Sequence, residues 1–202
     1  TLEFLDFETG KIKPILPLHP LSYLLKTQKA FQSHPTEFKV QNNRLSFVYH
    51  LEPAIYDVNL QDPQLKQSRT PIPISNFIAD PGFPFGTVKS PNDQDDYAGS
   101  VFGLFKSGPY DLIIFQRGLE REKWPVGIYD QEEMTREMKR RNPDQWLLRV
   151  NGKEFTQPKP LSTRFKNLRS DSKGRIWAMQ NVADLEEEPD AITIYQLKIN
   201  PL

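Results

Sequence analysis

The chain has 202 residues and a mass of 23.5 kDa, and its 26 basic and 26 acidic residues give a formal net charge of zero. The absence of cysteine excludes disulfide scaffolds, thiolate metal sites and cysteine nucleophiles. No apolar run reaches the roughly 18 residues of a membrane-spanning helix, and zero net charge argues against a strongly nucleic-acid-binding surface. At about 100–200 residues per domain, the length predicts a single domain over residues 1–202.

The first ten residues contain no basic stretch followed by an apolar one, so they do not resemble a signal peptide. We therefore expect a cytoplasmic protein that does not associate with membranes. Because the chain begins at Thr1 and lacks an initiator methionine, a signal peptide already removed is compatible with the sequence.

The composition includes 18 prolines against 10 glycines, which limits helices and interrupts strands. Apolar residues on both sides of a turn at Gly10 predict a hairpin over residues 4–12. A first helix is predicted over 20–33, where Pro20 suits the first turn and Leu21 and Leu24 share one face.

A second hairpin is predicted over residues 39–49, because asparagine at 42 and 43 tolerates the left-handed backbone of a tight turn. Strands are expected at 56–60 and 72–78. Residues 79–99, rich in proline and aspartate, predict a long loop that is mobile over 86–98.

The strongest strand pair is predicted at 100–105 and 110–116, joined by a turn at 106–109. Its apolar run over 112–115 indicates the centre of a sheet. The side chains expected to be mostly buried are Leu112, Ile113, Ile114, Phe115, Trp146, Leu148 and Trp177.

A second helix is predicted over 131–141, with Asp130 as its N-cap and Glu133 in capping-box register. Asn151-Gly152 then predicts a tight hairpin, and 175–182 and 191–199 are expected to be the final strands. About ten strands against two helices predict a mainly β or α+β fold, with an antiparallel sheet, sandwich or barrel built from hairpins.

Two short segments, residues 5–11 and 172–177, have sequences typical of β-propeller blades. A propeller also calls for an internal period of roughly 40 residues, and the sequence has no such period. The pattern therefore favours a sheet without internal repeats.

No nucleophile elbow, phosphate-binding loop or dinucleotide-binding motif occurs, and the three histidines are scattered. These absences favour a non-catalytic binding or assembly module with no cofactor and no metal. The expected partner is an unknown ligand or another protein, and nucleic acid is not favoured.

The first alternative is a phosphate- or nucleic-acid-binding protein that uses the basic segment 136–175. Residues 159–175 include six basic residues and one acidic residue. The acidic run 184–190 is a candidate for neutralising this positive charge within the fold. The candidate anion-binding residues are Arg140, Arg141, Arg149, Lys159, Arg164, Lys166, Arg169, Lys173 and Arg175.

The second alternative is a carboxylate- and metal-dependent hydrolase or nuclease. Its candidate residues are Asp93, Asp95 and Asp96 in the long loop and Asp111 at the head of the apolar strand. The loop does not match an EF-hand, because Leu104 stands where that motif places its bidentate acid.

Overall fold

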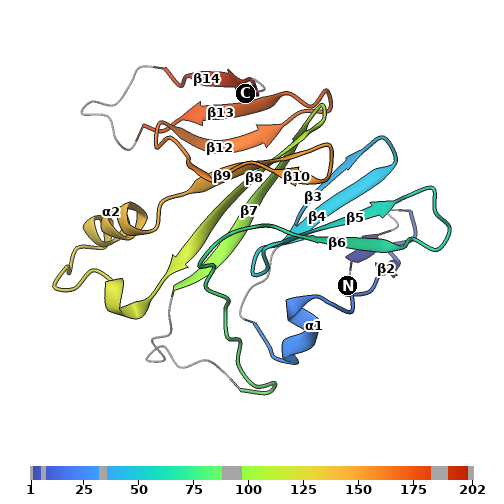
Figure 1. The fold of residues 1–202 in the computed structure, drawn as a ribbon, viewed down its shortest axis with the longest axis horizontal. Coiled ribbons are helices and arrows are strands. Elements are labelled where there is room, and N and C mark those ends of the chain that lie inside the picture. Colours follow the sequence, from blue (N-terminus) through green and yellow to red (C-terminus); the bar gives the residue numbers. More distant parts are fainter. Residues whose placement is uncertain (1, 6–7, 32–35, 88–96, 183–190, 200–202) are drawn as a thin grey trace.

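A computed structural model describes the chain except residues 1, 6–7, 32–35, 88–96, 183–190 and 200–202 (Figure 1). The described residues form three antiparallel sheets of three or more strands, a separate two-stranded ribbon and two α-helices, with no closed barrel. The predicted mainly β, antiparallel fold built from hairpins is therefore confirmed. The predicted mobile loop falls mainly on residues 88–96, which lie outside the described part of the chain.

Sheet I contains four strands in sequence order. Its strands are β3 (Thr36–Gln41), β4 (Arg44–Tyr49), β5 (Ala54–Asn59) and β6 (Gln67–Pro71). The hairpin predicted at Asn42 and Asn43 is confirmed, with φ of 50° and 57°. The strand predicted over 72–78 is wrong. The edge strand lies earlier in the chain, where the polar residues 67–70 pair with β5 on one side. The prolines at 71 and 73 have no N–H to donate to a neighbouring strand, so the strand does not continue past them.

Sheet II also follows sequence order. It contains β7 (Tyr97–Ser107), β8 (Tyr110–Leu119), β9 (Gln145–Val150) and a fourth strand in two pieces, β10 (Glu154–Phe155) and β11 (Lys159–Pro160). Asn151 and Gly152 have φ of 50° and 72°, so the predicted tight turn between β9 and β10 is confirmed.

Sheet III contains β12 (Phe165–Ser170), β13 (Ile176–Gln180) and β14 (Ile194–Leu197). The final two strands agree with the predicted ones but are shorter. The sequence did not indicate β12, because its charged residues were interpreted as a basic patch. Lys166 and Arg169 are the residues of β12 that point away from sheet II, which explains why a strand carries them.

The helices differ in how well they were predicted. Helix α2 (Gln131–Arg141) has the predicted bounds, and the Asp130 carboxylate accepts a hydrogen bond from the Glu133 N–H. The prediction of a helix over 20–33 is wrong in extent, since α1 spans only Tyr23–Thr27. The Ser22 side chain caps its start, and Gln28 ends it in the left-handed conformation.

Two smaller elements complete the fold. The predicted N-terminal hairpin is present as the ribbon of β1 (Leu2–Leu5) and β2 (Ile12–Leu16). A short 3₁₀-helix (Arg121–Lys123) follows β8. Helix α1 and β2 place Leu24 and Leu16 against the side of sheet I that faces away from sheet II.

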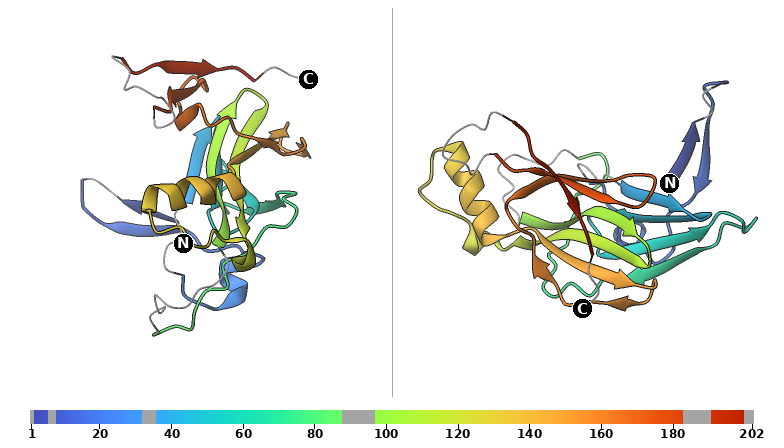
Figure 2. Two further views of the ribbon diagram at one scale, coloured as in Figure 1. Left: turned by 90° about the vertical axis from the view of Figure 1, so that its left-hand side faces the viewer. Right: turned by 90° about the horizontal axis from the view of Figure 1, so that it is seen from above.

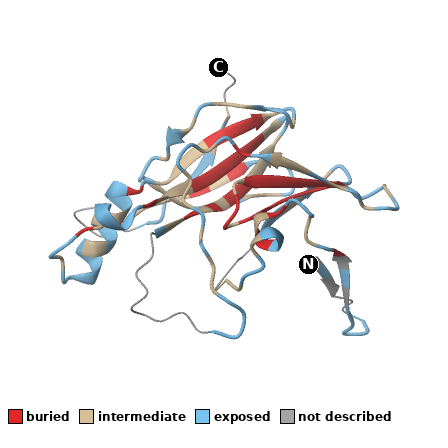
Figure 3. Ribbon diagram, turned by 60° about the horizontal axis from the view of Figure 1, so that its bottom comes forward, coloured by how far each residue is buried: buried red, intermediate tan, exposed pale blue. Residues whose placement is uncertain are grey.

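Sheet II lies between the other two sheets and is buried on both faces at its centre (Figures 2 and 3). Along β8, Ile113 and Phe115 pack toward sheet I, whereas Leu112 and Ile114 pack toward sheet III. This explains the continuous apolar run, because a strand covered on both faces has no polar side. The predicted burial is confirmed for these four residues and for Leu148. Trp146 and Trp177 are only half-buried.

The sheets are arranged as a fan, in which β7 contacts both β3 and β12, the first strands of the neighbouring sheets (Figure 1). In the described part of the chain, the three sheets therefore follow one another in space in the order of the sequence, without closing a barrel. The sheets begin at Thr36, Tyr97 and Phe165, so their spacing is unequal and exceeds the roughly 40-residue period of common propeller repeats.

Candidate functional site: a cavity between two sheets

The interface between sheets I and II contains a buried ion-pair network. Arg149 on β9 donates through Nε to Asp111 Oδ2 at 2.8 Å and through Nη1 to Asp57 Oδ2 at 2.6 Å. Lys106 Nζ lies 2.9 Å from Asp111 Oδ1, and the Ser46 hydroxyl donates to Asp57 Oδ1 at 2.6 Å. Arg149 and Asp111 are each 1% exposed and Asp57 is 4% exposed, so the network joins the two sheets away from solvent.

The network holds the Asp57 carboxylate in the charged form. Burial by itself raises the pKa of Asp57, but hydrogen bonds from Arg149 and Ser46 and the charge of Arg149 lower it more, so the pKa lies below 3.8. Each of the three enclosed charges, Arg149, Asp57 and Asp111, has a partner of opposite sign. The network therefore has a structural role, because charged groups enclosed in this way cannot contact a substrate.

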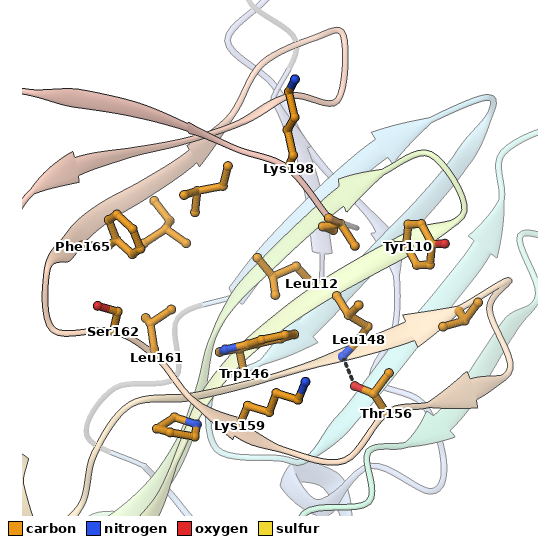
Figure 4. A pocket seen from close by; sticks show the side chains of 15 residues that line it. Tyr110, Leu112, Trp146, Leu148, Thr156, Lys159, Leu161, Ser162, Phe165 and Lys198 are labelled. Atoms are coloured by element: carbon orange, nitrogen blue, oxygen red, sulfur yellow. Dashed lines mark hydrogen bonds between the residues drawn. The ribbon is translucent and has the colours of Figure 1, made fainter. Parts of the chain in front are cut away.

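The interface between sheets II and III is apolar and incompletely filled. A cavity of about 530 Å³ lies between β8 and β9 on one side and β12, the 159–162 segment and the 197–199 segment on the other (Figure 4). Its walls are mainly apolar and aromatic. They are formed by Tyr110, Leu112, Trp146, Leu148, Val150, Pro160, Leu161, Phe165, Leu168, Leu197 and Ile199, together with Thr156, Lys159, Ser162 and Lys198.

The few polar side chains that line the cavity differ in whether their polar atoms lie beside it or point away from it. The Lys159 ammonium lies 5.7 Å from the centroid of the Trp146 ring, beside the cavity. The Lys198 side chain extends away from the cavity, so that only its stem contributes to the wall (Figure 4). The Thr156 hydroxyl accepts a hydrogen bond from the Leu148 N–H at 2.9 Å and keeps its own proton for another acceptor. One cation and one hydroxyl therefore lie on the same side of an apolar space.

The structure does not bring the nine predicted anion-binding residues together. Arg149 belongs to the buried network, and Arg140 and Arg141 both bond the Glu137 carboxylate on α2. Arg175 pairs with Asp171 at 2.6 Å. Lys159 belongs to the cavity, and the remaining four lie in or beside sheet III. These four are Arg164, Lys166, Arg169 and Lys173.

The predicted metal-binding carboxylates are separated in a similar way. Asp93, Asp95 and Asp96 lie outside the described residues, and the Asp111 carboxylate is enclosed by Arg149 and Lys106. No group of three or more potential metal ligands occurs within the described part of the chain. Within the same residues, no helix is both long and apolar enough to cross a membrane.

The cavity was not predicted from the sequence. Its wall combines residues from β8, β9 and sheet III that are up to 89 positions apart, and no local motif marks such a combination. Among the aromatic wall residues, Trp146 was predicted to be mostly buried, and it is half-buried beside the cavity. The one available signal was that aromatic residues alternate with lysines over 146–166, a pattern that is equally typical of a solvated surface.

Comparison with known proteins gives no relative from which a function could be inferred. No protein-family model, no curated protein and no solved structure matches the chain. The functional argument therefore depends on the cavity itself.

Proposed function

We propose that the protein is a non-catalytic binding module that takes a small apolar ligand with an anionic end in the cavity between sheets II and III. The observation that carries the proposal is the cavity of about 530 Å³ with a mainly apolar wall. Pockets for small ligands have volumes of about 300–1,000 Å³ and are lined mostly by apolar side chains with a few polar groups that fix orientation.

The anionic end of the ligand is inferred from Lys159. Its ammonium and the Thr156 hydroxyl flank the same part of the cavity, and together they suit a carboxylate or sulfonate. Most of the remaining wall, including Leu112 on β8 and Leu168 on β12, is apolar and suits an alkyl chain or an aromatic ring.

A titration tests the proposal with the whole chain. The fluorescent probe 1-anilinonaphthalene-8-sulfonate combines an aromatic body with an anion, and dodecanoate should displace it in a saturable manner. Because Trp146 lines the cavity, excitation of tryptophan should transfer energy to the bound probe. A larger decrease of this transfer in Trp146→Phe than in Trp124→Phe would support a probe bound at the cavity.

Filling the cavity provides the matched comparison. Leu161 is a half-buried wall residue, whereas Leu18 is a half-buried residue packed against the other side of sheet I. Leu161→Trp should abolish saturable binding, and Leu18→Trp should leave it unchanged. Equal binding by wild type and Leu161→Trp would overturn the proposal, as would the absence of saturable binding by wild type.

The role of Lys159 is separable from that of the apolar wall. Lys159→Ala should weaken dodecanoate binding by about 1 kcal/mol, or about fivefold, and leave dodecanol binding unchanged. Lys198→Ala is the control, because its ammonium points away from the cavity. If both variants lose dodecanoate equally, the anion is held only by general surface charge.

A further inference from the structure

The walls of the cavity differ in how firmly the rest of the fold holds them. Strands β8 and β9 each pair with neighbours on both of their edges. On β12, Leu168 is buried, and this strand also contacts β7. The 159–162 segment pairs with β9 through β11, and the Leu161 N–H donates to the Asp144 carbonyl at 2.8 Å. Each of these walls therefore belongs to sheet II or is attached directly to it.

The fourth wall belongs to the β14 segment, which we define as residues 194–199. Within the described residues, β14 is an edge strand that pairs with β13 alone (Figure 1). No residue of the β14 segment is buried, and its wall residues Leu197 and Ile199 are half-buried against the cavity. Parts of a fold with few buried contacts are those that open first. The β14 segment is therefore the wall most easily displaced.

A backbone hydrogen bond and a ring contact hold the β14 segment beside the cavity. At its start, the Thr193 carbonyl accepts a hydrogen bond from the Gln180 N–H at 2.8 Å. In its middle, the Tyr195 ring meets the Phe165 ring of β12 edge-on, with the ring centroids 5.4 Å apart. Phe165 lines the cavity and Tyr195 does not, so this pair restrains the segment without Tyr195 forming part of the wall. Both contacts lie before the wall residues at 197–199.

We infer that the β14 segment acts as a strap across the cavity, which a bound ligand holds closed and whose separation from β13 releases the ligand. The inference rests on the proposed function, because it concerns the release of the ligand that the cavity takes up. A ligand that fills the cavity contacts Leu197 and Ile199 and so adds contacts to the most weakly held wall. Binding and closure therefore favour each other, and the opening of the segment sets the rate of release.

Because the chain contains no cysteine, an engineered pair can form only one intramolecular disulfide. Trp177 and Gln196 are register partners, as are Met179 and Ile194. Both pairs lie on the side of sheet III away from sheet II, because they alternate with Ala178, which packs toward sheet II. Directly opposite residues of antiparallel strands have Cα atoms about 4.5–5.5 Å apart, which suits a disulfide. The first pair lies next to the wall residues, and the second lies at the end already held by the backbone hydrogen bond.

Stopped-flow displacement of bound 1-anilinonaphthalene-8-sulfonate by excess dodecanoate measures the rate of release. With Trp177→Cys and Gln196→Cys oxidised, release should slow at least about tenfold, and dithiothreitol should restore the rate of the reduced variant. With Met179→Cys and Ile194→Cys oxidised, the matched control, release should slow by less than about threefold. Equal slowing by both disulfides, or no slowing by the first, would overturn the strap. Circular dichroism checks that both variants are folded.

Loosening the strap should have the opposite effect. Tyr195→Ala removes the ring contact with Phe165 and leaves every wall residue in place, so release should become about fivefold faster. Tyr129→Ala, at a side chain that is 99% exposed, is the control and should leave the rate unchanged. A rate in Tyr195→Ala equal to that of wild type would contradict the inference.

Failure of the strap and failure of the proposed function give different results. If wild type shows no saturable binding, or if Leu161→Trp binds as well as wild type, the proposed function fails and the strap fails with it. If binding is saturable and is lost in Leu161→Trp, but neither disulfide changes the rate, only the strap fails. Hydrogen exchange gives a second readout, in which saturating dodecanoate should slow exchange more at the amides of 194–197 than at those of 165–170. Equal protection of the two strands would contradict the strap.

Discussion

The two interfaces of sheet II are built from the same strands and differ in almost every other property. Toward sheet I, β8 and β9 contribute Asp111 and Arg149 to an enclosed ion-pair network. Toward sheet III, the neighbouring residues Leu112 and Leu148 border a cavity of about 530 Å³. A buried charge network accepts only one geometry, whereas an apolar interface tolerates a gap. The comparison indicates that the first interface fixes the fold and that the second is available for a ligand.

The largest expected effect comes from removing the centre of the charged interface. Arg149→Met would leave Asp57 and Asp111 buried without their shared partner. Breaking a buried pair in this way costs about 3–5 kcal/mol of unfolding free energy, measurable by urea denaturation. Arg164→Met, at an exposed residue, should stay within about 0.5 kcal/mol of wild type. A loss below about 1 kcal/mol for Arg149→Met would show that the network does not hold the sheets together.

Neighbouring leucines on β9 compare the two interfaces directly. Leu147 is 0% exposed and packs toward sheet I, whereas Leu148 is 7% exposed and lines the cavity. Leu147→Ala should lie near the upper end of the range of about 2–5 kcal/mol, and Leu148→Ala near the lower end, because Leu148 already lacks neighbours on one side. Only Leu148→Ala should alter binding of the fluorescent probe. A larger loss of stability in Leu148→Ala than in Leu147→Ala would place the looser packing between sheets I and II.

Acid should weaken the charged interface before it affects the apolar one. The pKa of Asp57 is lower in the folded chain than its ordinary 3.8, so the unfolded chain binds its proton more readily. Its contribution to stability is complete above the unfolded pKa and is lost as the pH falls through the folded one, from about pH 5 downward. Asp57→Asn should flatten this part of the curve of unfolding free energy against pH, whereas Leu148→Ala should only shift the curve downward. An unchanged slope in Asp57→Asn would contradict the assignment.

The smallest expected effect concerns the outer surface of sheet III. The triple variant Arg164→Glu, Lys166→Glu and Arg169→Glu tests the nucleic-acid alternative, by titration with single- and double-stranded oligonucleotides at two salt concentrations. We expect no tight binding by the wild-type chain, because its net charge is zero. Binding that weakens steeply with salt and is lost in the variant would instead favour the basic segment as the functional surface.

Local signals in the sequence predicted the hairpins and the longer helix because their causes are local. Asparagine at 42 and 43, Asn151-Gly152 and the Asp130 cap each act within a few residues. The apolar run 112–115 indicated a central strand for the same reason. The prediction was wrong for 72–78 and for most of 20–33, where backbone partners such as Pro53 and Phe83 come from distant segments.

The candidate site depends on contacts between residues that are far apart in the sequence. Arg149 was assigned to an anion-binding patch, because nothing near it in sequence shows that Asp57, far earlier in the chain, encloses it. The cavity exists because β12 and β14 form a separate sheet beside β8 and β9. The sequence failed to indicate β12 as a strand, so neither that sheet nor the space behind it was predicted.

The most direct measurement is a methyl NMR titration of the leucine-labelled chain with dodecanoate. Leu112, Leu148, Leu161 and Leu168 line the cavity, and Leu104 and Leu147 lie in the interface between sheets I and II. We predict saturable shifts of the methyl groups of these four cavity leucines with one common dissociation constant, while those of the other two leucines stay unchanged. Equal shifts in both sets, or no saturable shift at the cavity leucines, would contradict the claim that the interface between sheets II and III is the ligand site.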